Sequence, residues 1–210
     1  MIALRDNSPA VVGPGIYPML YAFFDDRGVL RQDPFRLQVD VALGTQAAGV
    51  AILGLGTEVS KLTFDERIDV LEVVAKRIDG RKPLLATVYG DTITEQIEFS
   101  KQAIQSGTSA LMLQPPSQKM DDAKLVDFFS EIISAVDCPV GIQNAPEFLG
   151  FGLSNESLIA LANDHENFTI AKLECNAVNL QSVASDLGDS VMLFNGRCGL
   201  ELPDNLRAGA

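Results

Sequence analysis

Short apolar runs alternate with amphipathic segments along the chain, at intervals of about 25–30 residues, the size of one strand–helix–strand unit. The runs are almost continuously apolar, a pattern typical of strands that are buried on both faces of a parallel sheet. They are Ile16–Phe24, Val50–Leu55, Pro83–Tyr89, Ala110–Gln114, Val140–Gln143, Phe168–Leu173 and Val191–Phe194. The pattern therefore predicts an α/β fold with parallel strands.

The segments between these runs carry the signals of helices. Apolar stripes at helical spacing run from Ile68 to Ile78, from Ile93 to Ile104 and from Leu125 to Val136. A further helix is predicted around Leu202–Ala208. Helix starts are predicted by capping residues, namely Asp33 before Pro34, Thr63 with Glu66, and Thr92 with Glu95.

The number of units favours a barrel over an open sheet. About seven strands exceed the usual five or six of a doubly wound sheet and fall one short of the eight strands of a β/α barrel. We expect a (β/α)8 TIM barrel, here incomplete, with residues 1–210 forming one domain without an internal linker. Because an open barrel leaves sheet edges unpaired, we expect the chain to be truncated, cleaved or partly observed at its C-terminus.

Composition narrows the classes of function. The formal net charge of −12 opposes nucleic acid and anionic membranes, and no apolar run approaches a membrane span or a signal peptide. Three cysteines without a CxxC pair favour a reduced, cytoplasmic protein. The single histidine, His165, leaves little material for a metal centre or a Ser–His–Asp triad. We therefore expect no metal and no cofactor.

Lys172 is the most informative side chain. Functional groups of β/α barrels gather at the carboxyl ends of the strands, and Lys172 lies near the end of the apolar strand Phe168–Leu173. A lysine there either extends its ammonium group to water or is desolvated. Desolvation favours the neutral amine, which can attack a carbonyl and form an iminium. The residue alone leaves both interpretations open.

The segment Gly54–Glu58 follows the second predicted strand. Its two glycines allow backbone N–H groups to approach an anion such as a carboxylate. A simple tight turn explains them equally well. The spacing fits neither a dinucleotide fingerprint nor a P-loop.

Four strand-end motifs together resemble the dihydrodipicolinate synthase/N-acetylneuraminate lyase family of class I Schiff-base enzymes, from about Gly15 to Ala210. The motifs are Gly15–Gly28 for the opening strand, Gly54–Glu58 for the second-strand Gly-Thr-Thr-Gly-Glu loop, Gln143–Pro146 for Tyr-Asn-x-Pro, and Phe168–Lys172 for the strand of the Schiff-base lysine. The resemblance implies a barrel with C-terminal helices that this chain lacks. It also implies a homo-oligomer, namely a tetramer.

Several positions depart from the family pattern. Gln143 stands where the family has a tyrosine that relays protons, and glutamine cannot act as an acid or base near neutral pH. The paired threonines of the second-strand loop fall on Leu55 and Gly56. Phe148 replaces an arginine that would hold a dicarboxylic partner, which argues against lysine biosynthesis. Ser117 takes the place of the fourth-strand tyrosine.

The pair Lys172 and Glu174, together with Gln143–Pro146 and Asn195–Arg197, is similar to the 2-keto-3-deoxy sugar acid dehydratase branch. The resemblance implies a lyase for a small 2-keto acid, either a dehydratase or an aldolase, with Lys172 as the nucleophile. Gln143 would orient the substrate. Glu174 would carry protons or hold Lys172 in place. Substrate contacts are predicted for Tyr21, Gly56, Thr57, Glu58, Asn144, Asn195 and Gly196.

Two alternatives stay open at this point. The loss of the family tyrosine at Gln143 suggests a non-catalytic barrel that binds 2-keto acids. A pyruvate condensation of the dihydrodipicolinate synthase type uses the same Schiff base.

Overall fold

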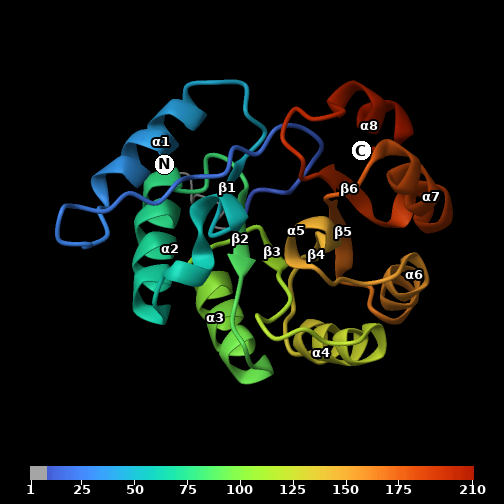
Figure 1. Ribbon diagram of the computed structural model, residues 1–210. Helices are drawn as coiled ribbons and strands as arrows, with labels where there is room; N and C mark the ends of the chain where they lie inside the picture. Colours follow the sequence, from blue (N-terminus) through green and yellow to red (C-terminus); the bar gives the residue numbers. More distant parts are fainter. Residues whose placement is uncertain (1–8) are drawn as a thin grey trace, which may run out of the picture. The chain divides into compact units, whose positions relative to one another are not determined.

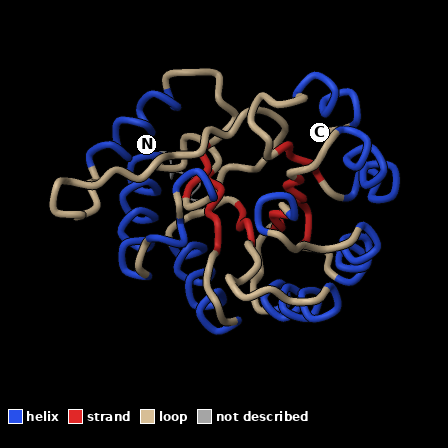
Figure 2. The backbone as a smooth tube through the Cα atoms, viewed as in Figure 1, coloured by secondary structure: helices blue, strands red, loops and turns tan. Residues whose placement is uncertain are grey.

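The computed structural model of the protein describes residues 9–210, apart from the side chain of Asp189. Its six parallel strands form one sheet in chain order, and at least one helix follows each strand (Figures 1 and 2). The strands are β1 (Val50–Ile52), β2 (Leu84–Val88), β3 (Ala110–Leu113), β4 (Val140–Asn144), β5 (Phe168–Leu173) and β6 (Met192–Asn195). The predicted α/β fold with parallel strands is confirmed.

The helices include two that no sequence signal above had located, α6 and α7. They are α1 (Asp33–Leu43), α2 (Phe64–Ile78), α3 (Ile93–Gln105), α4 (Asp122–Ser134), α5 (Pro146–Leu149), α6 (Asn155–Asp164), α7 (Ala177–Leu187) and α8 (Leu202–Ala208). Three short 3-10 turns are η1 (Leu55–Thr57), η2 (Val59–Lys61) and η3 (Gly188–Ser190).

The first predicted strand, Ile16–Phe24, is a correction. It forms no regular strand but a single parallel bridge between Met19 and Ala51 and an antiparallel bridge between Phe24 and Leu30. The Ala51 N–H donates to Pro18, the Leu20 N–H donates to Ala51, and the chain then turns back on itself. Pro18 has no N–H to extend the ladder.

Local chemistry explains the helix boundaries. Thr63 forms the predicted capping box, in which its hydroxyl accepts from the Glu66 N–H and the Glu66 carboxylate accepts from the Thr63 N–H. At α1 the helix starts at Asp33 itself, with Gln32 at the N-cap. Helix α2 buries Leu71, Val74 and Ile78 from its predicted stripe, while α4 buries Leu125, Phe128 and Ile132.

The chain divides into two compact units. The first comprises the described residues up to Thr87 together with Phe99–Leu111, and in it α1 packs on α2. The second comprises Val88–Glu98 and Met112–Ala210. In the second unit α4, α6, α7 and α8 pack side by side in that order (Figure 1). Whether residues 1–210 behave as one domain stays a prediction.

A final observation concerns membranes. Within residues 9–210, every helix is too short or too polar to cross a bilayer.

Candidate active site

The register of three neighbouring strands aligns the predicted catalytic side chains in the second unit. Gln143 on β4 pairs with Lys172 on β5, and Lys172 pairs with Phe194 on β6. Side chains at paired positions of parallel strands point to the same face of the sheet. Lys172 therefore lies between Gln143 and Phe194 on one face, near the carboxyl ends of the strands.

Glu174 joins Lys172 on that face, because the two residues are two positions apart in an extended segment. The Lys172 Nζ donates to Glu174 Oε1 at 2.8 Å. The Lys172 side chain is 20% exposed and that of Glu174 is 6% exposed. This geometry provides a largely buried lysine side chain whose ammonium donates to the Glu174 carboxylate.

Gln143 completes the cluster from the other side. Its Nε2 donates to the same oxygen, Glu174 Oε1, at 2.5 Å, and its Oε1 accepts from Gln114 Nε2 at 2.8 Å. Gln114 follows β3 directly, and its side chain was not among the predicted site residues. The sequence offered only its place at the end of a strand as a signal.

Gly196 lies directly against the Glu174 side chain. A Cβ atom at this position would meet the Glu174 side chain, with its Cγ at 2.4 Å and its Oε1 at 2.7 Å. The Gly196 N–H donates to the Leu173 carbonyl at 3.0 Å, which fixes this close approach. The glycine thus gives the Glu174 side chain the space that it occupies.

Asn144 and Asn195 lie on the opposite face of their strands, because each is next to a residue of the row that contains Lys172. Asn144 binds the Leu153 backbone with both ends of its amide, at 3.0 Å each. The Asn195 Oδ1 accepts from the Arg197 N–H at 2.8 Å. These positions favour support of the loops after β4 and β6, while contact with substrate stays a prediction for both residues.

Cys175 and Arg197 also lie after the ends of β5 and β6. Burial, and then the nearby Glu147 carboxylate, raise the pKa of the Cys175 thiol, which disfavours a reactive thiolate. Arg197 pairs with Glu147 and Glu201 at 3.4 Å each. The role of Lys172 as the nucleophile stays a prediction.

The second-strand loop belongs to the first unit. Thr57 is buried, and its hydroxyl donates to the Leu20 carbonyl at 2.5 Å, while the exposed Glu58 pairs with Lys61. Gly56 is exposed beside the Tyr21 ring, and the Tyr21 backbone is held by Gln38. Substrate contact by Tyr21, Gly56, Thr57 and Glu58 stays a prediction.

The backbone of this loop is strained. Leu53, fully buried directly after β1, has a φ of 61°, a conformation that costs a residue other than glycine on the order of 1 kcal/mol or more. Glu58 at the other end of the loop has a φ of 58°. Such strain is often kept where a loop has a function.

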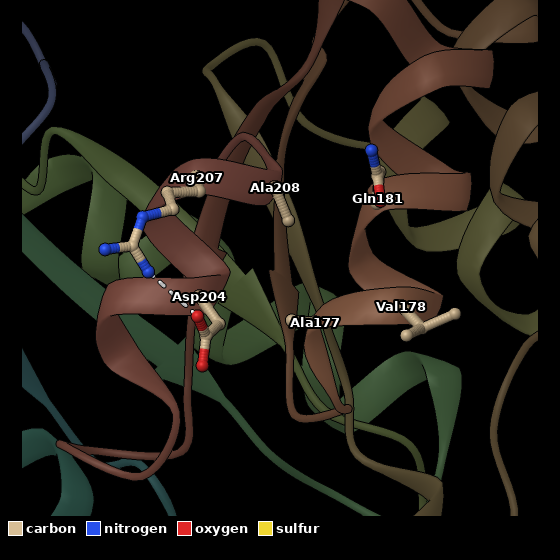
Figure 3. Close-up of a pocket in the computed structure, with 6 residues that line it drawn as sticks. All are labelled: Ala177, Val178, Gln181, Asp204, Arg207 and Ala208. Carbon is tan, nitrogen blue, oxygen red and sulfur yellow. Dashed lines mark hydrogen bonds and ion pairs between the residues drawn. The ribbon is translucent and has the colours of Figure 1, made fainter.

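A pocket of about 250 Å³ lies between α7 and α8 (Figure 3). It is lined by Ala177, Val178, Gln181, Asp204, Arg207 and Ala208, and Asp204 and Arg207 pair with each other at 2.9 Å. None of the residues of the Lys172 cluster lines it. Among the described side chains of residues 9–210, which leave out Asp189, no group of three His, Cys, Asp or Glu is placed to hold a metal ion.

Many known proteins are similar to this chain in sequence. The model of the Dihydrodipicolinate synthetase family matches residues 13–210. The chain is 27% identical over 171 residues to the 4-hydroxy-tetrahydrodipicolinate synthase of Pelobacter propionicus, covering 80% of this chain and 59% of that protein. It is 26% identical over 189 residues to YagE of Escherichia coli, provisionally named a 2-dehydro-3-deoxy-D-gluconate aldolase, covering 89% of this chain and 63% of that one. The chain thus spans about three fifths of the length of these curated relatives.

Solved structures show the same fold. Dihydrodipicolinate synthase from Aquifex aeolicus matches with a TM-score of 0.87 and 24% identity, over 93% of this chain and 67% of that one. Escherichia coli YagE, solved in complex with pyruvate, matches with a TM-score of 0.87 and 25% identity, over the same 93% and 67%.

Proposed function

Because this chain belongs to the dihydrodipicolinate synthetase family, we propose that it is a class I lyase that acts on a 2-keto-3-deoxy sugar acid. Lys172 forms the Schiff base. The observation that carries the proposal is the contact of 2.8 Å between Lys172 Nζ and Glu174 Oε1, in the strand that matches the family's lysine motif. A lysine that is largely shielded from water at a strand end, with a carboxylate in contact that can exchange a proton with it, supports attack on a keto group.

The first half of the proposed reaction makes the nucleophile. The Lys172 ammonium gives one proton to the Glu174 carboxylate, which leaves a neutral amine and a carboxylic acid. The amine nitrogen attacks C2 of the substrate, and the former keto oxygen takes the proton back from Glu174. Glu174 then carries a second proton from the Lys172 nitrogen to this oxygen, which leaves as water as the C=N bond of the iminium forms.

The second half uses the iminium as an electron sink. The Glu174 carboxylate removes a proton from C3 and passes it to the hydroxyl group on C4, which leaves as water. Addition of one water to the remaining iminium then releases the 2-keto acid product and Lys172, so that the net reaction is the loss of one water. Gln143 orients the substrate through hydrogen bonds but transfers no proton. Glu174 thus takes the part of the tyrosine that the family pattern has at position 143, since it is the titratable side chain in contact with Lys172.

Three other outcomes have support of their own. Cleavage of the C3–C4 bond starts from the same iminium, and the name of the relative YagE favours that aldolase reaction. Pyruvate condensation is favoured by the curated relatives named as 4-hydroxy-tetrahydrodipicolinate synthases. Gln143 in place of the tyrosine favours a binding protein without turnover.

The test is borohydride reduction in the presence of pyruvate, and separately of a 2-keto-3-deoxy sugar acid, followed by peptide mass mapping. We expect the reduced adduct on Lys172 in the wild-type protein and none in the Lys172→Arg variant. A folded wild-type protein that yields no adduct on Lys172 contradicts the Schiff base. Turnover to a dehydrated 2-keto acid supports the dehydratase, release of pyruvate supports the aldolase, and an adduct without turnover supports the binding protein.

A further inference from the structure

Three buried polar side chains from three successive strand ends form one hydrogen-bonded line. Gln114 follows β3, Gln143 lies on β4 and Glu174 follows β5, and their exposed fractions are 2%, 1% and 4%. Gln114 Nε2 donates to Gln143 Oε1, and Gln143 Nε2 donates to Glu174 Oε1. Lys172 joins the line at its end, because it donates to that same oxygen.

The direction of this line follows from one charge. An ionised carboxylate only accepts hydrogen bonds, so Gln143 must turn its N–H2 group toward Glu174. The oxygen of the Gln143 amide then faces Gln114, and Gln114 must present its own N–H2 group. Reversing either amide would bring two acceptors face to face in a buried place, which is costly.

Gln114 is held by groups outside the line. Its backbone N–H donates to the Val88 carbonyl at 3.0 Å, and its carbonyl accepts from Gln96 Nε2 at 3.0 Å. Gln96 is fully buried and also donates to the Gly90 carbonyl at 2.9 Å. The Gln114 side chain therefore starts from a fixed backbone and can fix its neighbour in turn.

We propose that Gln114 is a positioning residue, which holds the Gln143 amide with its nitrogen toward Glu174 and so keeps Glu174 ready to accept the proton of Lys172. The role rests on the proposed function, in which the ammonium loses one proton and the carboxylate gains it. Two N–H groups directed at one oxygen fix the Glu174 carboxylate in contact with Lys172 in the resting protein. Without Gln114, the Gln143 amide is free to turn its oxygen toward Glu174, which brings two acceptors face to face beside Lys172.

The test variant is Gln114→Glu, which keeps the size of the side chain and removes its N–H2 group. With pyruvate as the probe, we expect the limiting rate of adduct formation, trapped by borohydride, to fall roughly ten- to a hundredfold. The pyruvate concentration for half-saturation stays within about twofold, because Gln114 does not contact the substrate in this role. An unchanged limiting rate, or a changed half-saturation alone, contradicts the inference.

The double variant Gln114→Glu/Glu174→Gln tests the direction of the hydrogen-bonded line separately from the proton transfer. It reverses the direction of the two hydrogen bonds that join residues 114, 143 and 174, since residue 114 accepts from Gln143 and residue 174 donates to it. We expect Gln114→Glu to lower Tm by roughly 5 °C or more and the double variant to regain most of that loss. Adduct formation stays low in the double variant, because the proton acceptor is gone.

These readouts keep the two ideas apart. Loss of the adduct in the wild-type protein defeats the proposed function, yet the Tm comparison still tests the direction of the line. A double variant no more stable than Gln114→Glu overturns the inference whatever the activity. The control Asn167→Asp removes an N–H2 group that donates to the Ile133 and Val136 carbonyls, and we expect it to lower Tm without changing the adduct rate.

Discussion

Lys82 and Lys172 show how the same side chain is used in two ways. Lys82, before β2, donates to the carbonyls of Ala42, Thr45 and Ala47 at 3.2, 2.9 and 2.5 Å. Three neutral acceptors satisfy all three N–H groups of an ammonium, and the Ala42 carbonyl belongs to the last turn of α1, where a cation is favoured. Among the described residues, Lys172 has one hydrogen-bond partner, Glu174, whose carboxylate can accept a proton. The two lysines thus differ in the kind of partner, neutral carbonyls for Lys82 and a carboxylate for Lys172, and the reactivity of Lys172 stays a prediction.

The largest effect is expected when each lysine is replaced by methionine. We expect Lys172→Met to reduce trapping of pyruvate by borohydride at least about a thousandfold, because no other amine lies in the cluster. Lys82→Met should form the adduct at a rate close to wild type. Equal losses in the two variants, measured by intact mass after reduction, would abolish the distinction between the two lysines.

The second effect concerns the free energy of unfolding, to which we expect Lys82 to contribute more than Lys172. We expect Lys82→Met to lower the free energy of unfolding by about 1–3 kcal/mol, since three carbonyls lose their donor. Urea denaturation followed by circular dichroism measures this change. The control Lys76→Met, at an exposed position of α2, should stay within about 0.5 kcal/mol of wild type. A Lys82→Met variant as stable as the control would show that the three hydrogen bonds contribute nothing.

The smallest effect extends the comparison to carboxylates. Like Lys82, Asp122 is a charged side chain whose three hydrogen-bond partners are neutral: it accepts from the Ser154 N–H, the Ser154 hydroxyl and the Ser157 hydroxyl. Burial acts to raise the pKa of Asp122, but the hydrogen bonds from Ser157 and Ser154 outweigh it and hold that pKa below its usual range.

The sign of the pH dependence follows from that direction. A lowered folded-state pKa contributes stability above the unfolded value of about 3.9, and the contribution disappears as the pH falls through the folded value. We expect Asp122→Asn to be less stable than wild type by under about 1 kcal/mol near pH 6, with the gap closing at more acidic pH. Urea midpoints across the pH range measure the gap. The variant Asp127→Asn, at an exposed position of the same helix, serves as the control. A gap that widens on acidification would contradict the assignment.

The sequence predicted much of the fold because parallel strands leave a strong apolar signal. Phe168–Leu173 was predicted to the residue, and most other strands within one or two positions. At Ile16–Phe24 the apolar run predicted neither pairing nor burial, since Leu20 is its only buried residue while Ile16 and Phe23 are exposed. The sequence signals used above did not locate helices α6 and α7, although both have N-cap residues. The side chains of Ser154 and Asn176 each accept a hydrogen bond from the backbone N–H three residues later.

The candidate site was predictable only in part. Lys172 stood out because a charged residue interrupts an apolar strand, and Glu174 followed from its spacing two residues later. Gln114 could not be found in this way, because its role depends on which strand end lies beside Gln143. The same holds for Asn144, whose amide binds a loop nine residues away. Register across strands is a three-dimensional property that a single chain does not encode locally.

Gly196 has a consequence for anyone who evolves this protein in the laboratory. Since even one added carbon would collide with the Glu174 side chain, a library that randomises position 196 should yield few clones with the parental chemistry. Survivors with a larger residue there would tend to carry a second change at position 174. Substitutions at positions 196 and 174 are thus expected to depend on each other. Selection for new substrates is better directed at positions that leave the Glu174 carboxylate where it lies.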